Sequence, residues 1–306
     1  MINDETLLSE NPRIVKNPET SDFYSTTIPN LRFLPLPLAV LTLPYNQITD
    51  TVWSRENKNF KLWLSAGYNE QGDFVGLPYG VMSRRILYYL FSEAVTKKNR
   101  CVTLGKNYTE ILQNLGVIES NQRAGGAHIK RFTEHLERLA TCSMQITGMA
   151  ENNTHTTCFY ESTKIIERCV YITSKSCREE STIQINISQK MYNYLIKDKH
   201  IPFLARTLQL CNGNAVVMDL YILFNLKAFS ASTTNKNVFV AFKELHRSLG
   251  TTSSYKNFIP TLKKSLAKLA NIQAKLDLSI SKKGVWVSRK SQSDVLSKHL
   301  YQQSLI

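Results

Sequence analysis

The same ordered series of sequence patterns occurs twice along this chain. Each copy runs through an apolar helical stretch, a short strand, a helix, a polar turn, another helix and two strand patterns. The second helix of each copy ends at a Leu-Gly pair, Leu115-Gly116 and Leu249-Gly250. The third helix of each copy ends in Leu-x-x-Leu-Ala, at residues 136–140 and 266–270. A series that recurs in one order indicates two structural repeats.

The first copy begins with a helix predicted to start near Ser83, an N-capping residue type, with apolar positions on one face at Ile86, Leu87, Leu90, Phe91 and Ala94. Tyr88 and Tyr89 follow the same spacing, which favours core positions over a base-stacking surface. After a strand at 101–104, Asn107 and Glu110 have the spacing of a capping box. A turn at 120–126 leads to a helix over 127–140, followed by alternating strand patterns around Met144 and Ile183 and a strand at 164–173.

The second copy repeats these elements with a helix at 216–228, a strand at 238–240 and a helix at 242–249. A turn over 251–254 precedes a helix whose inward positions are Phe258, Leu262, Leu266 and Leu269. Asn257 is its predicted N-cap, because Pro260 would then lie in the first turn. Strands at 274–280 and 285–287 are joined by a basic hairpin. A helix at 189–196 and a hinge at 198–202 separate the copies.

This order is that of a winged helix, in which a helix-turn-helix is followed by a β-wing. We therefore predict an α+β fold with two tandem winged-helix domains, a number that suits 306 residues. The predicted boundaries are an N-terminal arm at 1–32, a first domain at 33–197, a second domain at 203–292 and a C-terminal tail at 293–306.

Charge is concentrated in the second copy. The chain has a net charge of +14, and residues 240–306 hold 12 Lys or Arg against three Asp or Glu, whereas residues 1–60 hold five against seven. A clustered positive charge fits a polyanionic partner, because each neutralised phosphate releases condensed counterions. A basic surface that stays solvated without a partner is the alternative.

The candidate DNA-binding residues of the second copy lie in the turn and on the outward face of the helix after it. They are Thr252, Ser253, Ser254, Tyr255, Lys256, Asn257, Lys263, Lys264 and Lys268, with Thr261 on the same face. Hydroxyls and amides at a helix N-terminus suit phosphate oxygens and base edges. Lys282 and Lys283, at the tip of the wing, would contact the phosphate backbone; a charged tip that protects a sheet edge is the alternative.

The first copy offers Arg123, His128, Lys130, Arg131 and Arg138 as DNA-binding residues. Glu134 interrupts this positive face, so a protein interface is the alternative for this helix. His128 and His135 fall on one face and are expected at the surface rather than as metal ligands.

The sequence contains no motif that would indicate another class of function. The six cysteines form no Cys-x-x-Cys pair, the six histidines no His-x-His pair, and the chain has neither a phosphate-binding loop nor a Gly-x-Ser-x-Gly elbow. We expect no metal, no cofactor and no enzymatic activity, which argues against a nicking enzyme. No apolar run reaches the ~18 residues of a membrane span, and the acidic start is unlike a signal peptide, so the expected location is the cytoplasm.

Several motifs in order resemble the plasmid-encoded RepA replication initiator family. They are Gly76-Leu77-Pro78-Tyr79-Gly80, Ser92-Glu93-Ala94, Leu115-Gly116, Gly125-Gly126 and Leu136-x-x-Leu139, within residues 30–190. Residues 200–290 resemble the second winged helix of iteron-binding initiators in architecture.

The resemblance implies a bacterial protein that binds direct repeats in double-stranded DNA at a plasmid origin, promotes duplex opening and recruits host replication proteins. It also implies a homodimer through the first domain and a part in plasmid copy control. The alternative is a winged-helix transcriptional regulator, such as an autorepressor, without a role in initiation. An interaction-only protein would bind no specific DNA.

Overall fold

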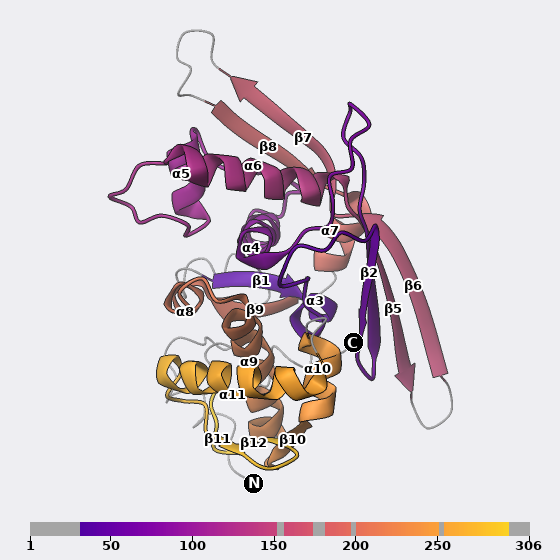
Figure 1. Cartoon of the computed structure of the whole chain (residues 1–306), viewed down its shortest axis with the longest axis vertical. Coiled ribbons are helices and arrows are strands. Elements are labelled where there is room, and N and C mark those ends of the chain that lie inside the picture. Colours follow the sequence, from indigo (N-terminus) through magenta and orange to yellow (C-terminus); the bar gives the residue numbers. More distant parts are fainter. Residues whose placement is uncertain (1–30, 152–155, 174–180, 197–199, 251–253, 294–306) are drawn as a thin grey trace.

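The computed structural model describes residues 31–151, 156–173, 181–196, 200–250 and 254–293, with the backbone alone at 149–151, 156–161, 173 and 181. Helices and several small sheets form two halves that are stacked along the long axis of the molecule (Figure 1). Every strand pair in these residues is antiparallel. The chain therefore has a mixed α+β architecture.

The elements of the first half follow one another in this order: β1 (Leu31–Pro35), α3 (Leu36–Val40), β2 (Val52–Glu56), β3 (Phe60–Ser65), α4 (Gly80–Thr96), β4 (Cys101–Thr103), α5 (Tyr108–Asn114), α6 (Gly126–Thr141), β5 (Ser143–Glu151), β6 (Thr156–Lys164), β7 (Ile166–Thr173), β8 (Ser181–Ile187) and α7 (Gln189–Ile196). The second half contains β9 (His200–Leu204), α8 (Ala205–Leu210), α9 (Ala215–Thr234), β10 (Val238–Ala241), α10 (Phe242–Leu249), α11 (Tyr255–Ile272), β11 (Leu278–Ile280) and β12 (Gly284–Val287).

The two halves repeat one topology. In the first, α4 precedes β4, α5 and α6, and the sheet order is β4-β8-β7. In the second, α9 precedes β10, α10 and α11, and the sheet order is β10-β12-β11. Each sheet thus places the short strand beside the last strand, with the second-last strand at the far edge. The repeated series in the sequence corresponds to a repeated arrangement in space.

The first half has one addition to this plan. The β5–β6 hairpin enters the chain between α6 and β7, and it joins β2 and β3 in a four-stranded sheet, β2-β3-β5-β6. Leu62 and Leu64 of β3 lie opposite Ile146 and Met144 of β5, and all four side chains are buried. Residues 152–155, between β5 and β6, lie outside the described residues.

Helix α9 forms the core of the second half. Its buried side chains are distributed around the whole helix, from Val217 to Ala231. By length and composition this helix could cross a membrane, but 72% of its apolar window is buried inside the protein. Buried core helices meet the same criterion, so its apolar character is accounted for by packing.

Two helix starts differ from the sequence prediction. Helix α4 begins at Gly80, and Ser83 is a buried residue of its first turn rather than a cap. Helix α11 begins at Tyr255 after Ser254, so Asn257 lies in the first turn and Pro260 lies inside the helix. Asn107, in contrast, caps α5 as predicted, because its Oδ1 accepts the backbone N–H of Glu110 at 2.9 Å.

The two Leu-Gly pairs need glycine for different reasons. Gly116 has φ of +65°, a left-handed conformation that glycine adopts without steric cost. Gly250 has φ of −60°, but a Cβ there would lie 2.0 Å from the carbonyl oxygen of His246. The first glycine reverses the chain direction after α5, and the second lets the chain pass close to the end of α10.

The halves are joined by pairing and by a buried charged cluster. Strand β1 pairs with β9 from Leu31 opposite Leu204 to Pro35 opposite His200. The predicted hinge at 198–202 therefore overlaps a paired strand, and β1 begins inside the predicted N-terminal arm. Arg84 of α4 also forms a buried ion pair with Asp219 of α9 at 2.7 Å. Residues 1–30 and 294–306, most of the predicted arm and tail, lie outside the described residues.

Candidate nucleic-acid interface

The outward face of α11 carries polar and basic side chains and no acidic one. Lys256, Lys263, Lys264 and Lys268 are exposed, as are Tyr255, Asn257 and Thr261, whereas Phe258, Leu262, Leu266 and Leu269 are buried. The helix contains no acidic residue. This is the division that the sequence predicted, and it leaves a face of one charge sign available to an anionic partner.

The start of α11 adds backbone donors to this face. No acidic side chain occupies its first turn, and Ser254 is exposed at the N-cap without a side-chain capping bond. The first N–H groups of a helix have no partner within the helix, and the helix dipole favours anions at this end. Thr252 and Ser253 lie outside the described residues.

The hairpin between β11 and β12 holds two lysines beside this helix unit. Lys282 and Lys283 are exposed, and the turn is closed by Ser281, whose Oγ accepts the backbone N–H of Gly284 at 3.1 Å. The carbonyl of Lys283 accepts the backbone N–H of Phe242, the first residue of α10, at 2.9 Å. The hairpin tip is thereby fixed to the helical part of its own half.

The first half presents a similar but mixed face. Arg123, His128, Lys130 and Arg131 are exposed, and Glu134 is exposed among them. The turn before α6 is built by Gln113, whose Nε2 donates to the carbonyls of Ser120 at 2.9 Å and Gln122 at 3.1 Å. Thr109 Oγ1 accepts the backbone N–H of Ala124 at 3.1 Å. These contacts hold Arg123 in a defined turn.

Arg138 differs from the other predicted residues because it is half-buried. Its guanidinium donates to the carbonyl of Leu77 at 3.3 Å and lies 5.3 Å from the centre of the Tyr79 ring. Gly76 makes room for it, since a Cβ there would lie 2.4 Å from Arg138 Nη1. In this conformation Arg138 holds the segment before α4, and its role as a DNA contact stays a prediction.

The prediction that His135 lies at the surface is wrong. Its side chain is 3% exposed, with Nδ1 2.9 Å from Ser83 Oγ and the ring beside Tyr79. Burial, followed by repulsion from Arg131 and Arg138, lowers the pKa of His135 to about 4. The seven-residue spacing from His128 was misleading because α6 rotates by about 20° over a heptad and packs His135 against α4.

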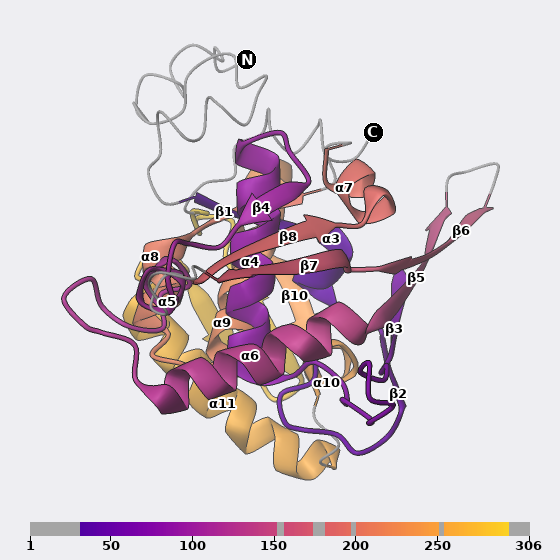
Figure 2. The same ribbon diagram turned by 90° about the horizontal axis from the view of Figure 1, so that it is seen from above.

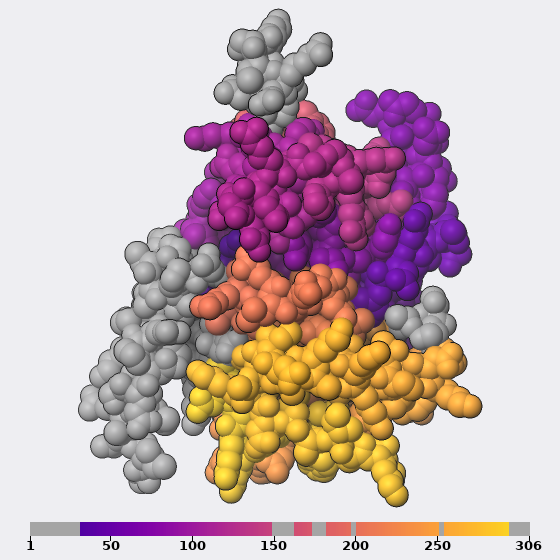
Figure 3. Space-filling view, turned by 60° about the vertical axis from the view of Figure 1, so that its left-hand side comes forward, coloured from indigo at the N-terminus to yellow at the C-terminus, as the bar shows by residue number. Residues whose placement is uncertain are grey.

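Helices α6 and α11 lie on one side of the molecule. In Figure 2 both run along the lower side of the view, and in Figure 1 both run across it, α6 in the upper half and α11 in the lower. Figure 3 shows the orange and yellow second half directly below the magenta and indigo first half. Two basic helices on one side can face one ligand together.

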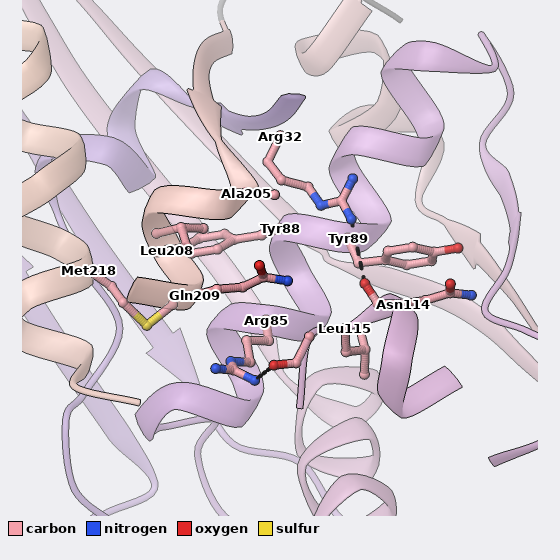
Figure 4. A pocket seen from close by; sticks show the side chains of 11 residues that line it. Arg32, Arg85, Tyr88, Tyr89, Asn114, Leu115, Ala205, Leu208, Gln209 and Met218 are labelled. Atoms are coloured by element: carbon pink, nitrogen blue, oxygen red, sulfur yellow. Dashed lines mark hydrogen bonds between the residues drawn. The ribbon is translucent and has the colours of Figure 1, made fainter. Parts of the chain in front are cut away.

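A small pocket lies where α4, the end of α5 and α8 meet (Figure 4). Two arginines line it, but both are engaged in holding the end of α5. Arg85 donates to the carbonyl of Gly116, and Arg32 donates to the carbonyl of Asn114 at 3.5 Å while lying over the Tyr89 ring. The pocket is therefore part of the scaffold that positions the turn before α6. Among the described residues no cluster of three or more His, Cys, Asp or Glu could hold a metal ion.

Comparison with known proteins identifies one family. Residues 77–242 match the family described as plasmid encoded RepA protein. Among solved structures, a crystal structure of selenomethionine derivatives of domains 2 and 3 of RctB has a TM-score of 0.49 at 12% identity, covering 86% of this chain and 99% of that chain. A crystal structure of RctB domains 2–3 has a TM-score of 0.45 at 10% identity, covering 82% and 95%. No curated protein matches the chain.

Proposed function

Because the chain belongs to the plasmid-encoded RepA family, we propose that it is a plasmid replication initiator that binds repeated DNA sequences at the plasmid origin. The match covers more than half of the chain, and the motifs in its sequence predicted the same family. Family membership supports a role in initiating replication. The repeats, duplex opening and recruitment of host replication proteins belong to our proposal.

In this proposal each half is a winged helix. Helices α5 and α6, and α10 and α11, are the helix-turn-helix pairs, while β7–β8 and β11–β12 are the wings. The repeated order of elements and the matching sheet orders support this interpretation. Helix α11 enters a major groove, and Lys282 and Lys283 contact the phosphate backbone.

The observation that carries the proposal is the shared orientation of two basic helices. The exposed lysines of α11 and the exposed Arg123, Lys130 and Arg131 belong to helix units on one side of the molecule. A duplex lying along that side would meet both units. The protein acts in this role without catalysis, cofactor or membrane, in the cytoplasm of its bacterial host, and a homodimer would form through the first half.

The test is a gel shift with the DNA that flanks the gene, at two salt concentrations. We expect Lys263→Ala with Lys264→Ala to weaken binding and to lower the salt slope by about 1–2, since each lost phosphate contact removes ~0.9. Lys97→Ala with Lys98→Ala removes two charges at the end of α4 that leads into β4, on the opposite side in Figure 2. This control should keep both the affinity and the slope.

An unchanged affinity and slope in the α11 variant would contradict the proposal. The DNA itself discriminates between the initiator and a transcriptional regulator. Several direct repeats of about two helical turns support the initiator, whereas a single palindrome supports the regulator. Metal-dependent strand cleavage would indicate a nicking enzyme, and the absence of any sequence-specific shift would indicate a protein that acts through interactions alone.

A further inference from the structure

The sheet of the second half has one face that none of the described helices covers. Val240, Val285 and Val287 are buried on the face toward α9 and α10. Because side chains alternate along a strand, Phe239 and Trp286 point to the opposite face. They remain 39% and 42% exposed, which is unusual for the two largest side chains of so small a sheet.

The two rings form a continuous aromatic surface. Phe239 lies directly opposite Trp286 in the β10–β12 register, and the ring centroids are 4.8 Å apart. Gly284 makes space for this arrangement, since a Cβ there would lie 2.7 Å from Cζ of Phe239. The Phe239 ring therefore lies over the backbone of β12, beside the indole of Trp286.

Basic residues predominate in the chain segments next to this surface. The chain segments at the ends of the three strands carry Lys236, Lys282, Lys283, Arg289 and Lys290, all exposed. Glu244 and Asp277 are the acidic residues that border the same strands, and exposed Lys243 and Lys275 lie next to them in the chain. An aromatic surface within a basic field suits a polyanion that has accessible planar groups.

A second exposed aromatic pair lies in a different electrostatic setting. Tyr68 and Phe74 are 63% and 41% exposed, with ring centroids 5.8 Å apart. The turn that joins them contains Glu70 and Asp73 and no Lys or Arg. The chain thus contains two aromatic pairs with similar exposure and ring contact whose adjoining chain segments carry opposite charge. Charge, rather than aromatic exposure alone, is therefore the feature that distinguishes the two pairs.

We infer that the face formed by Phe239 and Trp286 binds single-stranded DNA by stacking unpaired bases on the two rings. In a duplex the base faces are covered by neighbouring bases, so an aromatic platform selects strands that are already separated. The bordering lysines and arginines track the backbone of such a strand. This inference rests on the proposed initiator function in one respect: the single strand would come from an origin whose duplex has opened.

The binding test uses a labelled oligo-dT of about 12 nucleotides, which lacks secondary structure, and follows fluorescence anisotropy. We expect Phe239→Leu with Trp286→Leu to weaken binding by about tenfold or more. Trp286→Phe keeps a stacking ring and should retain most of the affinity. Tyr68→Leu with Phe74→Leu is the matched control and should bind as the unaltered chain does.

A second measurement needs no destabilising substitution. Oligo-dT should quench part of the tryptophan fluorescence of the unaltered chain, and that part should be absent from Trp286→Phe, in which Trp53 and Trp63 remain. The duplex gel shift is run on the same variants. If the unaltered chain does not bind duplex DNA, the proposed function is contradicted. If the unaltered chain binds duplex DNA but not oligo-dT, this inference alone is contradicted.

Three results would overturn the inference. Oligo-dT affinity could be unchanged in the double leucine variant, or it could fall equally in the Tyr68 and Phe74 control. Sedimentation could instead reveal a concentration-dependent dimer that the double leucine variant abolishes. In that last case the exposed face is a contact between two copies of the chain.

Discussion

At the scale of single residues, the ion pair between Arg84 and Asp219 is the most deeply buried charge interaction in the described residues. Both side chains are 2% exposed. Arg84 also donates to the carbonyls of Leu43, Pro44 and Gly80, so its guanidinium is fully engaged. Burial alone would lower the pKa of Arg84, but the carboxylate of Asp219 outweighs burial and raises it. The charge can be buried because every donor has a partner.

Removing one member of this pair should be worse than removing both. We expect Arg84→Met to lower the free energy of unfolding by about 3–5 kcal/mol, because Asp219 would be left as an uncompensated buried charge. Arg84→Met with Asp219→Leu should recover part of that loss. Urea unfolding of the two variants measures the difference, and equal losses would show that the charges are not coupled.

His135 should make stability depend on pH. Its pKa is about 4 in the folded state and about 6.5 when unfolded, so the unfolded chain binds more protons between these values. The contribution of neutral His135 is therefore complete above about pH 6.5 and is lost as the pH falls toward 4. We expect His135→Gln to remove this part of the decline in unfolding free energy. His128→Gln, at an exposed position of the same helix, should keep it.

At the scale of elements, the sequence predicts what is local and misses what is distant. Helices α5, α7 and α10 and strands β4 and β10 were predicted to within about a residue, because periodicity and the Asn107 cap are encoded nearby. Ser83 has the residue type of a cap, but its hydrogen-bond partner, His135, is 52 residues away and leaves no local signal in the sequence. The pairing of β1 with β9 has no local signature at all.

The candidate site shows the same division. The exposed face of α11 follows from the spacing of Phe258, Leu262, Leu266 and Leu269, and it was predicted. Helix α11 nevertheless begins two residues before the predicted cap and runs through Pro260, because tertiary packing outweighs the local cost of a missing N–H. The exposed ring pair of Phe239 and Trp286 could have been found from strand alternation, once both segments were read as strands.

Helix α10 is held by a residue from the other half of the chain. Arg55 of β2 donates through Nη1 to the carbonyl of Ser248 at 3.2 Å and through Nη2 to the carbonyl of Gly250. It is itself oriented by Thr42 Oγ1 at 2.7 Å and by the ring of Trp53. Arg55 thus supplies both donors and a positive charge at the negative end of the α10 dipole, close in the chain to the start of α11.

Arg55→Met should loosen the end of α10 without touching DNA. Two buried carbonyls would lose their donor, which costs about 1–3 kcal/mol for each unsatisfied group. We expect a lower unfolding free energy and faster amide hydrogen exchange in the last turn of α10. Lys61→Met, which also removes a cation beside a tryptophan but at a half-exposed position of the neighbouring strand β3, is the control. Equal exchange in both variants would rule out the capping role.

At the scale of the whole molecule, the contacts between the halves fix the relation between α6 and α11. The β1–β9 pairing, the Arg84–Asp219 ion pair and the Arg55 contacts connect different pairs of elements across the same boundary. Helices α3 and α4 also pack against α9. Several independent contacts of this kind leave little freedom for one half to rotate against the other. The two basic helices should therefore bind DNA as one rigid unit.

A rigid unit can bind only one spacing between the DNA segment that α6 contacts and the DNA segment that α11 contacts. Five base pairs inserted between the two segments would turn the second segment to the opposite face of the duplex, and ten would restore the face but move it ~34 Å away. If the halves were joined by a flexible linker, the ten-pair insertion would recover affinity. We expect both insertions to lower the affinity at least about tenfold, to the level of one half binding alone, because base contacts worth ~1–3 kcal/mol each are lost. Gel shifts with the original site and the two inserted sites measure these affinities for the unaltered protein and for Arg84→Met. If the unaltered protein regained its affinity on the site with ten inserted base pairs, the boundary between the halves would have to open on DNA.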